Sequence, residues 1–321
     1  MPISLTRTSL GEGILYYDGT QSQSLNRFKR AIFGYGGTGA GAITALTNIV
    51  SITGIIATDT TGVGTARQLL AAASYGGDKA IFGYGFITTT YDSRTNLVSN
   101  LGVVTGDVTG VGTPRSDLAA ASYGGDKAIF GYGADATSRL SMSNLVSNIG
   151  VVVTDGASVG TARRRLAAAG YGGDKAIFGY GQTGTTASTV VSMSNLVSNI
   201  GVVVADGANV GTARRNLAAA GYGGDKAIFG FGINGSSVYG VSIDLVSNIG
   251  VVTTGSNIVG TARAQLAAAS YGGDKAIFAY GYTGTTLVNI SNLISNLGVV
   301  VADATGVGTA RNSLAASGFG S

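Results

Sequence analysis

The chain has 321 residues, a formal net charge of +4 at pH 7 and a charged fraction of only 11%, so its surface must consist largely of uncharged polar residues. It contains no cysteine and no histidine, which excludes disulfides, thiolate chemistry and the commonest general base and transition-metal ligand. The start of the chain lacks an apolar core of signal-peptide length, and no run approaches the length of a membrane span, so we expect no membrane insertion.

Residues 1–26 belong to no repeat, and we expect them to form an N-terminal arm or attachment segment. Within them, Ile14, Leu15, Tyr16 and Tyr17 make a short apolar stretch with high β-propensity. Such a stretch can add a strand to a partner's sheet, or it can cover the body of its own chain. We favour attachment, and these four residues are the candidates for it.

A repeated block of about 48 residues occupies residues 27–321, which we treat as one domain. The register follows one arginine per unit, and six such arginines mean six units: Arg67, Arg115, Arg163, Arg214, Arg263 and Arg311. Each unit runs in the same order through Leu-Ala-Ala-Ala, a Gly-rich corner, Asp-Lys-Ala-Ile-Phe-Gly-Tyr-Gly, a variable stretch, Asn-Leu-Val-Ser-Asn and Gly-Val-Val-Val. Four short apolar runs between Gly, Asn, Asp and Ser predict four strands per unit.

Two of these runs, represented by residues 176–178 and 202–204, are apolar at consecutive positions, which predicts strands buried on both faces. Gly179 and Gly181 would let neighbouring sheets approach closely beside a large ring such as Tyr180. The run Arg214-Arg215-Asn216-Leu217-Ala218-Ala219-Ala220 leaves a helical repeat open as a rival, although Gly211 and Gly221 limit it to about two turns. Small Ala side chains favour instead an innermost strand beside a crowded channel.

The two ends of the repeat region complement one another. The last unit stops after Ala315-Ala316-Ser317-Gly318-Phe319, and Lys29-Arg30-Ala31-Ile32-Phe33 enters the repeat at the point where the next strand is due. We therefore predict an all-β, six-bladed β-propeller of four-stranded antiparallel blades, closed by pairing of the N- and C-terminal strands so that no sheet edge stays open.

An arginine, a small-residue strand, a Gly-Gly corner and an aromatic strand ending in Gly resemble the blades of kelch-type propellers across residues 27–321. The kelch family's late-strand tryptophan is missing, and the Gly-Gly pair precedes the aromatic strand. Low-complexity units of this Tyr-Gly-Gly-Asp-Lys style are also similar to propeller proteins of aquatic bacteriophages. The resemblance implies a structural or host-recognition role on a virion.

Most charges recur at fixed repeat positions with oppositely charged partners nearby, which indicates a structural role. No basic segment interleaved with aromatic residues occurs, so we expect no nucleic-acid partner. The Gly-rich corners lack the Gly-Lys-Ser/Thr arrangement of a phosphate loop. We expect no cofactor and no dedicated metal site, although the aspartate-bearing turns leave calcium open.

The informative deviations are the segments between the second and third strands, which differ in length and content: residues 37–47, 86–95, 134–143, 182–194, 233–243 and 282–291. In a four-stranded meander they emerge on one face, the usual layout of a recognition surface on a rigid scaffold. The candidate ligand-binding residues there are Tyr91, Asp92, Arg94, Asp135, Arg139, Tyr239 and Tyr282. Asp92 and Asp135 also provide the alternative of a polysaccharide hydrolase with two carboxylates.

The sequence thus predicts a non-catalytic virion protein of a phage tail or capsid, with other virion proteins bound to the arm and a host glycan or protein bound to the loops. A cellular lectin or interaction scaffold, cytoplasmic or extracellular, is the alternative, and a homo-oligomer remains open.

Overall fold

The computed structural model describes residues 30–320, and these residues are all-β, as predicted. Within residues 30–320 there is no α-helix, and one 3₁₀ turn, η1, occupies Ala187–Thr189. The helical alternative for the repeat is therefore wrong, because the alanines of the run that suggested it, Ala218 to Ala220, lie in strand β15 (Ala218–Tyr222). The arm and its attachment candidates Ile14, Leu15, Tyr16 and Tyr17 lie outside the described residues.

Six small antiparallel sheets make up the body of the molecule. The first three sheets contain the strands β23 (Ala315–Phe319), β1 (Arg30–Gly34) and β4 (Thr47–Val50); β5 (Ala71–Tyr75), β6 (Lys79–Ile87) and β7 (Thr90–Val98); and β8 (Ala119–Tyr123), β9 (Lys127–Gly131) and β10 (Ser143–Val146). The other three contain β11 (Ala167–Tyr171), β12 (Lys175–Gly179) and β13 (Ser194–Val197); β15, β16 (Lys226–Gly230), β18 (Ser242–Val246) and β19 (Val252–Asn257); and β20 (Ala267–Tyr271), β21 (Lys275–Ala279) and β22 (Ser291–Ile294). Two small pairs lie outside them: β2 (Gly37–Gly39) with β3 (Ala42–Ile43), and β14 (Arg214–Arg215) with β17 (Ile233–Asn234).

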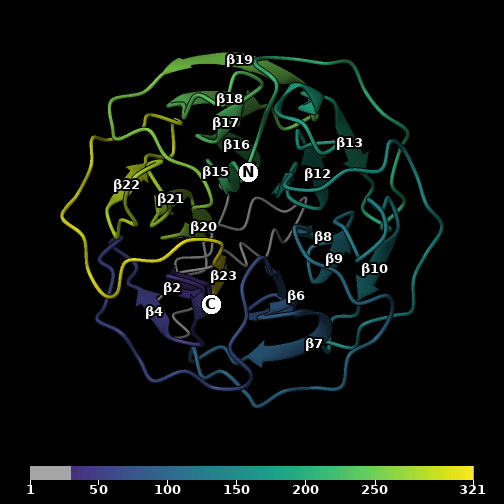
Figure 1. Cartoon of the computed structure of the whole chain (residues 1–321), viewed down its shortest axis with the longest axis vertical. Coiled ribbons are helices and arrows are strands. Elements are labelled where there is room, and N and C mark those ends of the chain that lie inside the picture. The colour runs from purple at the N-terminus through teal and green to yellow at the C-terminus, as the bar shows by residue number, and fades with distance from the viewer. Residues whose placement is uncertain (1–29, 321) are drawn as a thin grey trace, which may run out of the picture.

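The six sheets are arranged around a common axis, with the alanine-rich strand of each sheet innermost (Figure 1). Each of these inner strands contacts the inner strands of the two adjacent sheets, and β23 contacts both β20 and β5. In the first sheet β23, from the end of the chain, pairs antiparallel with β1, so that Arg30 faces Phe319 and Gly34 faces Ala315. The predicted pairing of the two chain ends is confirmed.

Backbone hydrogen bonds link neighbouring sheets in series. At the residue two places after each repeat arginine, the amide N–H donates to the equivalent carbonyl of the preceding sheet at 2.8–3.0 Å. The series runs through Leu69, Asp117, Arg165, Asn216, Gln265 and Ser313, and Leu69 donates in turn to Ser313. These bonds satisfy buried backbone groups that the short sheets leave free.

The apolar core lies between the sheets. Ala176, Ile177 and Phe178 are fully buried, which confirms the expectation of a strand covered on both faces. A Cβ placed on Gly179 would come within 2.8 Å of the Phe229 ring in the next sheet, so glycine here permits the close approach. The ring that requires the glycine is therefore Phe229 rather than the adjacent Tyr180.

The fourth run of each unit differs from its prediction. Within residues 30–320, only the fifth sheet has a fourth strand, β19. The equivalent outer segment of the other sheets makes one or two isolated bridges, such as Val197 with Val203. Val202 and Val204 are 55% and 51% exposed, so burial on both faces is wrong for this run. The reason is that the run lies at the outer edge of its sheet, where only the middle valine turns inward.

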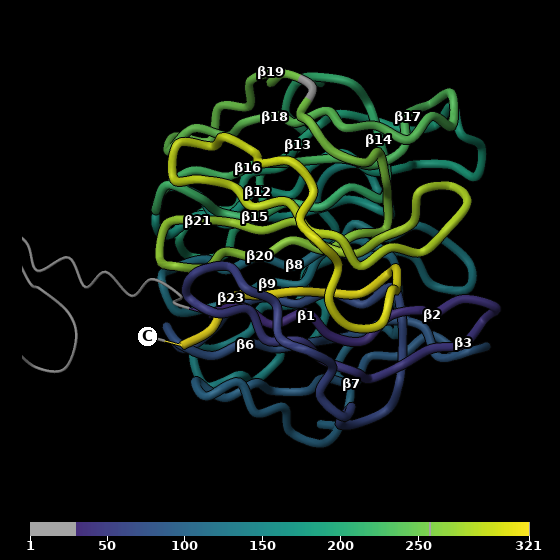
Figure 2. The backbone as a smooth tube through the Cα atoms, turned by 90° about the vertical axis from the view of Figure 1, so that its left-hand side faces the viewer, coloured from purple at the N-terminus to yellow at the C-terminus, as the bar shows by residue number. Residues whose placement is uncertain are grey.

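The two ends of the axis carry different segments of the chain, as Figure 2 shows. The variable segments, including β2, β3 and β17, project on one side, which we call the loop face. The Gly-Gly-Asp-Lys turns and the C-terminus lie on the other side, which we call the turn face. Because Arg30 pairs with Phe319, the described chain also begins at the turn face.

Candidate functional site

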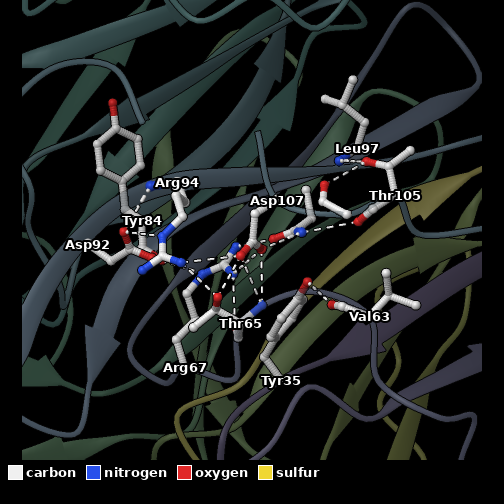
Figure 3. Close-up of polar contacts among 12 residues, drawn as sticks. Tyr35, Val63, Thr65, Arg67, Tyr84, Asp92, Arg94, Leu97, Thr105 and Asp107 are labelled. Carbon is white, nitrogen blue, oxygen red and sulfur yellow. Dashed lines mark hydrogen bonds and ion pairs between the residues drawn. The ribbon is translucent and has the colours of Figure 1, made fainter. Parts of the chain in front are cut away.

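The repeat arginines are structural, as their spacing predicted. Arg67 is fully buried, its Nε donates to the carbonyl of Tyr84 at 2.8 Å, and its Nη2 donates to Asn96 Oδ1 at 2.6 Å (Figure 3). Its guanidinium also stacks 4.5 Å from the ring centre of Tyr35 in the preceding sheet. The same cation–π contact recurs for the other five arginines at 4.2–4.5 Å, so these side chains join one sheet to the next.

Each of five sheets supplies an aspartate to this network. Asp107 lies 4.0 Å from Arg67, and it accepts hydrogen bonds from Asn96 and from the Thr65 backbone and hydroxyl (Figure 3). Burial disfavours the carboxylate, but the hydrogen bonds from Thr65 and Asn96 outweigh it and hold the pKa of Asp107 well below the usual range. The carboxylate therefore stays charged and balances the buried arginine.

The fifth sheet achieves the same charge balance with different residues. Asp244 occupies the position that is asparagine in the other units, and Gly255 stands eleven residues later where the others carry their aspartate. Asp244 Oδ2 lies 2.6 Å from Arg214 Nη1 and accepts a 2.7 Å hydrogen bond from the Tyr180 hydroxyl. Both members of the ion pair are buried, with exposed side-chain fractions of 3% and 1%. The carboxylate has moved to the neighbouring strand.

Each of the six variable segments pairs through its backbone with the same position of the repeat. The residue directly after each repeat arginine pairs with the first residues of a variable segment, as Gln68 does with Phe86 and Arg164 with Gln182. All six segments therefore lie at the same end of the six inner strands. This arrangement places the sequence candidates on or beside the loop face.

Two candidates in the second sheet belong to the structural network. Asp92 is buried and accepts hydrogen bonds from the backbone and Nε of Arg94 at 3.2 and 3.0 Å. Arg94 also donates to Thr65 Oγ1 at 2.7 Å and pairs with Asp107 at 3.2 Å. Tyr91, by contrast, stacks edge-on against Phe86, with ring centres 5.1 Å apart. It stays partly exposed.

In the third sheet, Asp135 caps its own loop. It accepts bonds from the backbone N–H groups of Thr137 and Ser138 at 2.8 and 2.7 Å. Burial opposes ionisation, but these hydrogen bonds outweigh it and lower the pKa of Asp135. Asp92 and Asp135 are thus each engaged by local groups. Arg139, four residues further on, donates to the carbonyl of Gly184 at 2.9 Å in the next variable segment.

Two tyrosine candidates meet across adjacent sheets. The rings of Tyr239 and Tyr282 lie 6.2 Å apart in an edge-to-face arrangement. The Tyr282 hydroxyl donates to the carbonyl of Gly284 at 2.8 Å. Both side chains are half-buried, so they form an amphipathic surface between the fifth and sixth variable segments.

The sequence analysis missed a second set of variable positions. They surround a small cavity at the loop-face end of the axis, which we call the channel mouth. Between the repeat arginine and the following leucine, two residues change from unit to unit inside an otherwise repeated segment. The second of them has a left-handed backbone in all six units, with φ between 53° and 59°: Leu69, Asp117, Arg165, Asn216, Gln265 and Ser313. The sequence did contain a signal for these residues, because the two positions vary from unit to unit whereas their neighbours do not.

Three arginines and one aspartate among these positions form what we call the arginine cluster: Asp117, Arg164, Arg165 and Arg215. Asp117 Oδ2 lies 3.3 Å from Arg165 Nε and 3.9 Å from Arg164 Nη1. Burial raises the pKa of Asp117, although the charges of Arg165 and Arg164 lower it. Burial, and after it the like charge of Arg165, lowers the pKa of Arg215.

Within residues 30–320, the lysines of the turn face are neutralised locally. Each of them pairs with the aspartate directly before it, at 2.9–3.2 Å. A cavity of about 160 Å³ lies at this end of the axis, lined mainly by glycine, serine, tyrosine and lysine. Because each of the five lysines in the described residues has its own carboxylate, these lysines add little net charge to the cavity.

Within residues 30–320, no group of three or more His, Cys, Asp or Glu side chains could hold a metal ion. The described part of the chain also contains no helix that is long and apolar enough to cross a membrane. No protein-family model matches the chain, and no curated protein matches its sequence.

Proposed function

We propose that the six sheets form a six-bladed, kelch-like β-propeller, and that this propeller is a non-catalytic recognition scaffold which binds a surface ligand through its loop face. The pairing of β1 with β23 and the series of backbone hydrogen bonds that returns from Leu69 to Ser313 support the propeller. Within residues 30–320, five of the six sheets have three full strands plus one or two outer bridges, so most blades are narrower than four strands.

The observation that carries the recognition role is the location of the variation. The frame repeats almost residue for residue, whereas the variable segments and the two variable positions per unit gather at one face. A rigid frame with varied loops is the usual arrangement of a binding surface. Tyr91, Tyr239 and Tyr282 supply partly exposed aromatic area there.

A glycan array tests this role. We expect the full-length chain to bind a subset of surface glycans, and a Tyr91→Ala/Tyr239→Ala/Tyr282→Ala variant to bind at least about tenfold more weakly, because each lost aromatic anchor costs on the order of 1–2 kcal/mol. A variant with Lys79→Ala and Lys226→Ala on the turn face is the matched control. Equal binding by both variants, with circular dichroism showing both folded, would refute recognition through the loop face.

The proposal extends to a virion surface, where residues 1–26 attach the propeller to other virion proteins. The described chain begins at the turn face, so attachment there leaves the loop face directed away from the point of attachment. Size-exclusion chromatography with light scattering, on the full chain and on a chain lacking residues 1–26, tests the attachment. We expect only the full chain to self-associate or to bind particle proteins. Identical behaviour of two folded monomers would remove the attachment role.

A further inference from the structure

The arginine cluster holds more positive charge than it can neutralise. Asp117, Arg164 with Arg165, and Arg215 come from three consecutive sheets. Arg164 and Arg165 share the Asp117 carboxylate, whereas the charge of Arg215 interacts with Arg165 and not with a carboxylate. Arg139 adds to this excess, since it lies within electrostatic range of Arg164. Each repeat arginine of the frame, in contrast, has a carboxylate of its own.

Several donors of these arginines are buried without a partner. The Nε of Arg164 and both Nε and Nη1 of Arg215 have no hydrogen-bond partner in residues 30–320, and neither does the Nε of Arg139. A buried donor of a charged group that stays unpaired costs free energy, and an incoming acceptor would recover that cost. The contact of Arg165 with Gln182 is long, at 3.4 Å, so this guanidinium also has donor capacity to spare.

The backbone at the channel mouth is left-handed in every unit. Arg165 and Asn216 have φ values of 59° and 55°, a conformation that glycine adopts at lower cost than they do. The chain uses glycine at 54 other positions, yet none of the six equivalent mouth positions is glycine. The repeat therefore keeps side chains at the channel mouth at some cost in backbone energy, as it also does at buried frame residues such as Tyr84.

A cavity of about 90 Å³ is lined by the left-handed residue of each unit and the leucine that follows it. Asp117 and Arg165 of the arginine cluster line this cavity directly, whereas Arg164 and Arg215 lie beside it in the same segments. One water needs roughly 10–15 Å³ of such space, so the cavity has room for a small polyatomic group. Tyr91 interacts electrostatically with Arg164, and Tyr239 with Arg215, so these two tyrosines belong to the surroundings of the arginine cluster although neither lines the cavity.

We propose that the arginine cluster binds the oxyanion of an acidic saccharide, a carboxylate or a sulfate, at the loop-face mouth of the channel. The forked donors of arginine match the geometry of such groups, and tyrosine rings suit the apolar face of the attached sugar. Nucleic acid fits less well, since it requires a basic stripe along its backbone rather than a single small cavity. This inference rests on the proposed recognition role and names the ligand class of that surface.

Isothermal titration of the full-length chain tests the site with three probes: trigalacturonate, a neutral galactose trisaccharide and inorganic sulfate. We expect trigalacturonate and sulfate to bind and the neutral sugar not to bind. Affinity should fall several-fold between about 20 mM and about 200 mM NaCl, because salt screens exposed charges. An Arg165→Gln/Arg215→Gln variant should bind trigalacturonate at least tenfold more weakly.

These substitutions are compatible with the fold, because Gln265 and Gln68 occupy the equivalent positions of other units. Lys226→Gln removes one positive charge from the turn face and should change the affinity less than twofold. Absence of trigalacturonate and sulfate binding to the unaltered chain would overturn the inference, as would undiminished binding by the folded double variant. If glycan binding still depends on Tyr91, Tyr239 and Tyr282 in that case, the recognition role stands and only the anion assignment fails.

Discussion

Replacing Asp244 with asparagine is expected to lower the free energy of unfolding by about 3–5 kcal/mol, because the change leaves a buried arginine without a counter-charge. Arg214 is almost fully buried, and Asp244 is the carboxylate that pairs with it. Asparagine would reproduce the side chain of the other units, but Gly255 cannot supply the aspartate that accompanies it there. The midpoint of urea unfolding measures the loss.

The control for this prediction is Asp225→Asn, which removes a carboxylate from an exposed pair with Lys226. Exposed pairs of this kind contribute about 0–1 kcal/mol, so its midpoint should barely move. Replacing Arg214 with methionine in the Asp244→Asn background should restore part of the stability, because it removes the unpaired charge. Equal shifts for Asp244→Asn and Asp225→Asn would show that the buried pair is unimportant.

Two features of the fold were predicted correctly from the sequence. Ala176 to Phe178 read correctly as a fully buried strand, and the sequences at the two chain ends predicted the pairing of β1 with β23. The run Val202 to Val204 looked equally apolar, yet it is largely exposed. Composition does not distinguish these cases, because burial depends on whether a neighbouring sheet covers the strand.

For the candidate site, the sequence located the variable face but selected an incomplete set of residues. Asp92 and Arg94 look like free loop residues in the sequence, whereas tertiary contacts join them to Asp107 and Thr65. The arginine cluster was missed because Arg164 and Arg165 directly follow a structural arginine. Arg165 lines the cavity because its left-handed backbone is held by a hydrogen bond to Asp117 in the preceding sheet, a contact that the sequence does not reveal.

The second large effect is expected from removing β23. A chain lacking residues 314–321 loses the inner strand of the first sheet, leaves the edge of β1 open, and deprives β20 and β5 of a shared neighbour. Leu314, Ala315 and Phe319 are buried, so their partners would also be exposed to water. In the proposed closed propeller, every sheet depends on two neighbours, and the loss should therefore spread through all six.

The chain lacking residues 1–26 serves as the control for this deletion, because it removes more residues but none of the repeat. We expect both this chain and the full chain to unfold in a single thermal transition. An open array behaves differently, since each unit depends only on its nearest neighbours and a terminal unit can be lost without the rest.

Differential scanning calorimetry of the chain lacking residues 314–321, beside the full-length chain, tests the closed propeller most directly. Closure predicts that the truncated chain shows no cooperative unfolding transition near that of the full chain. A sharp transition retaining about five-sixths of the full unfolding enthalpy would contradict closure, because it would mean that five units fold independently of the missing strand.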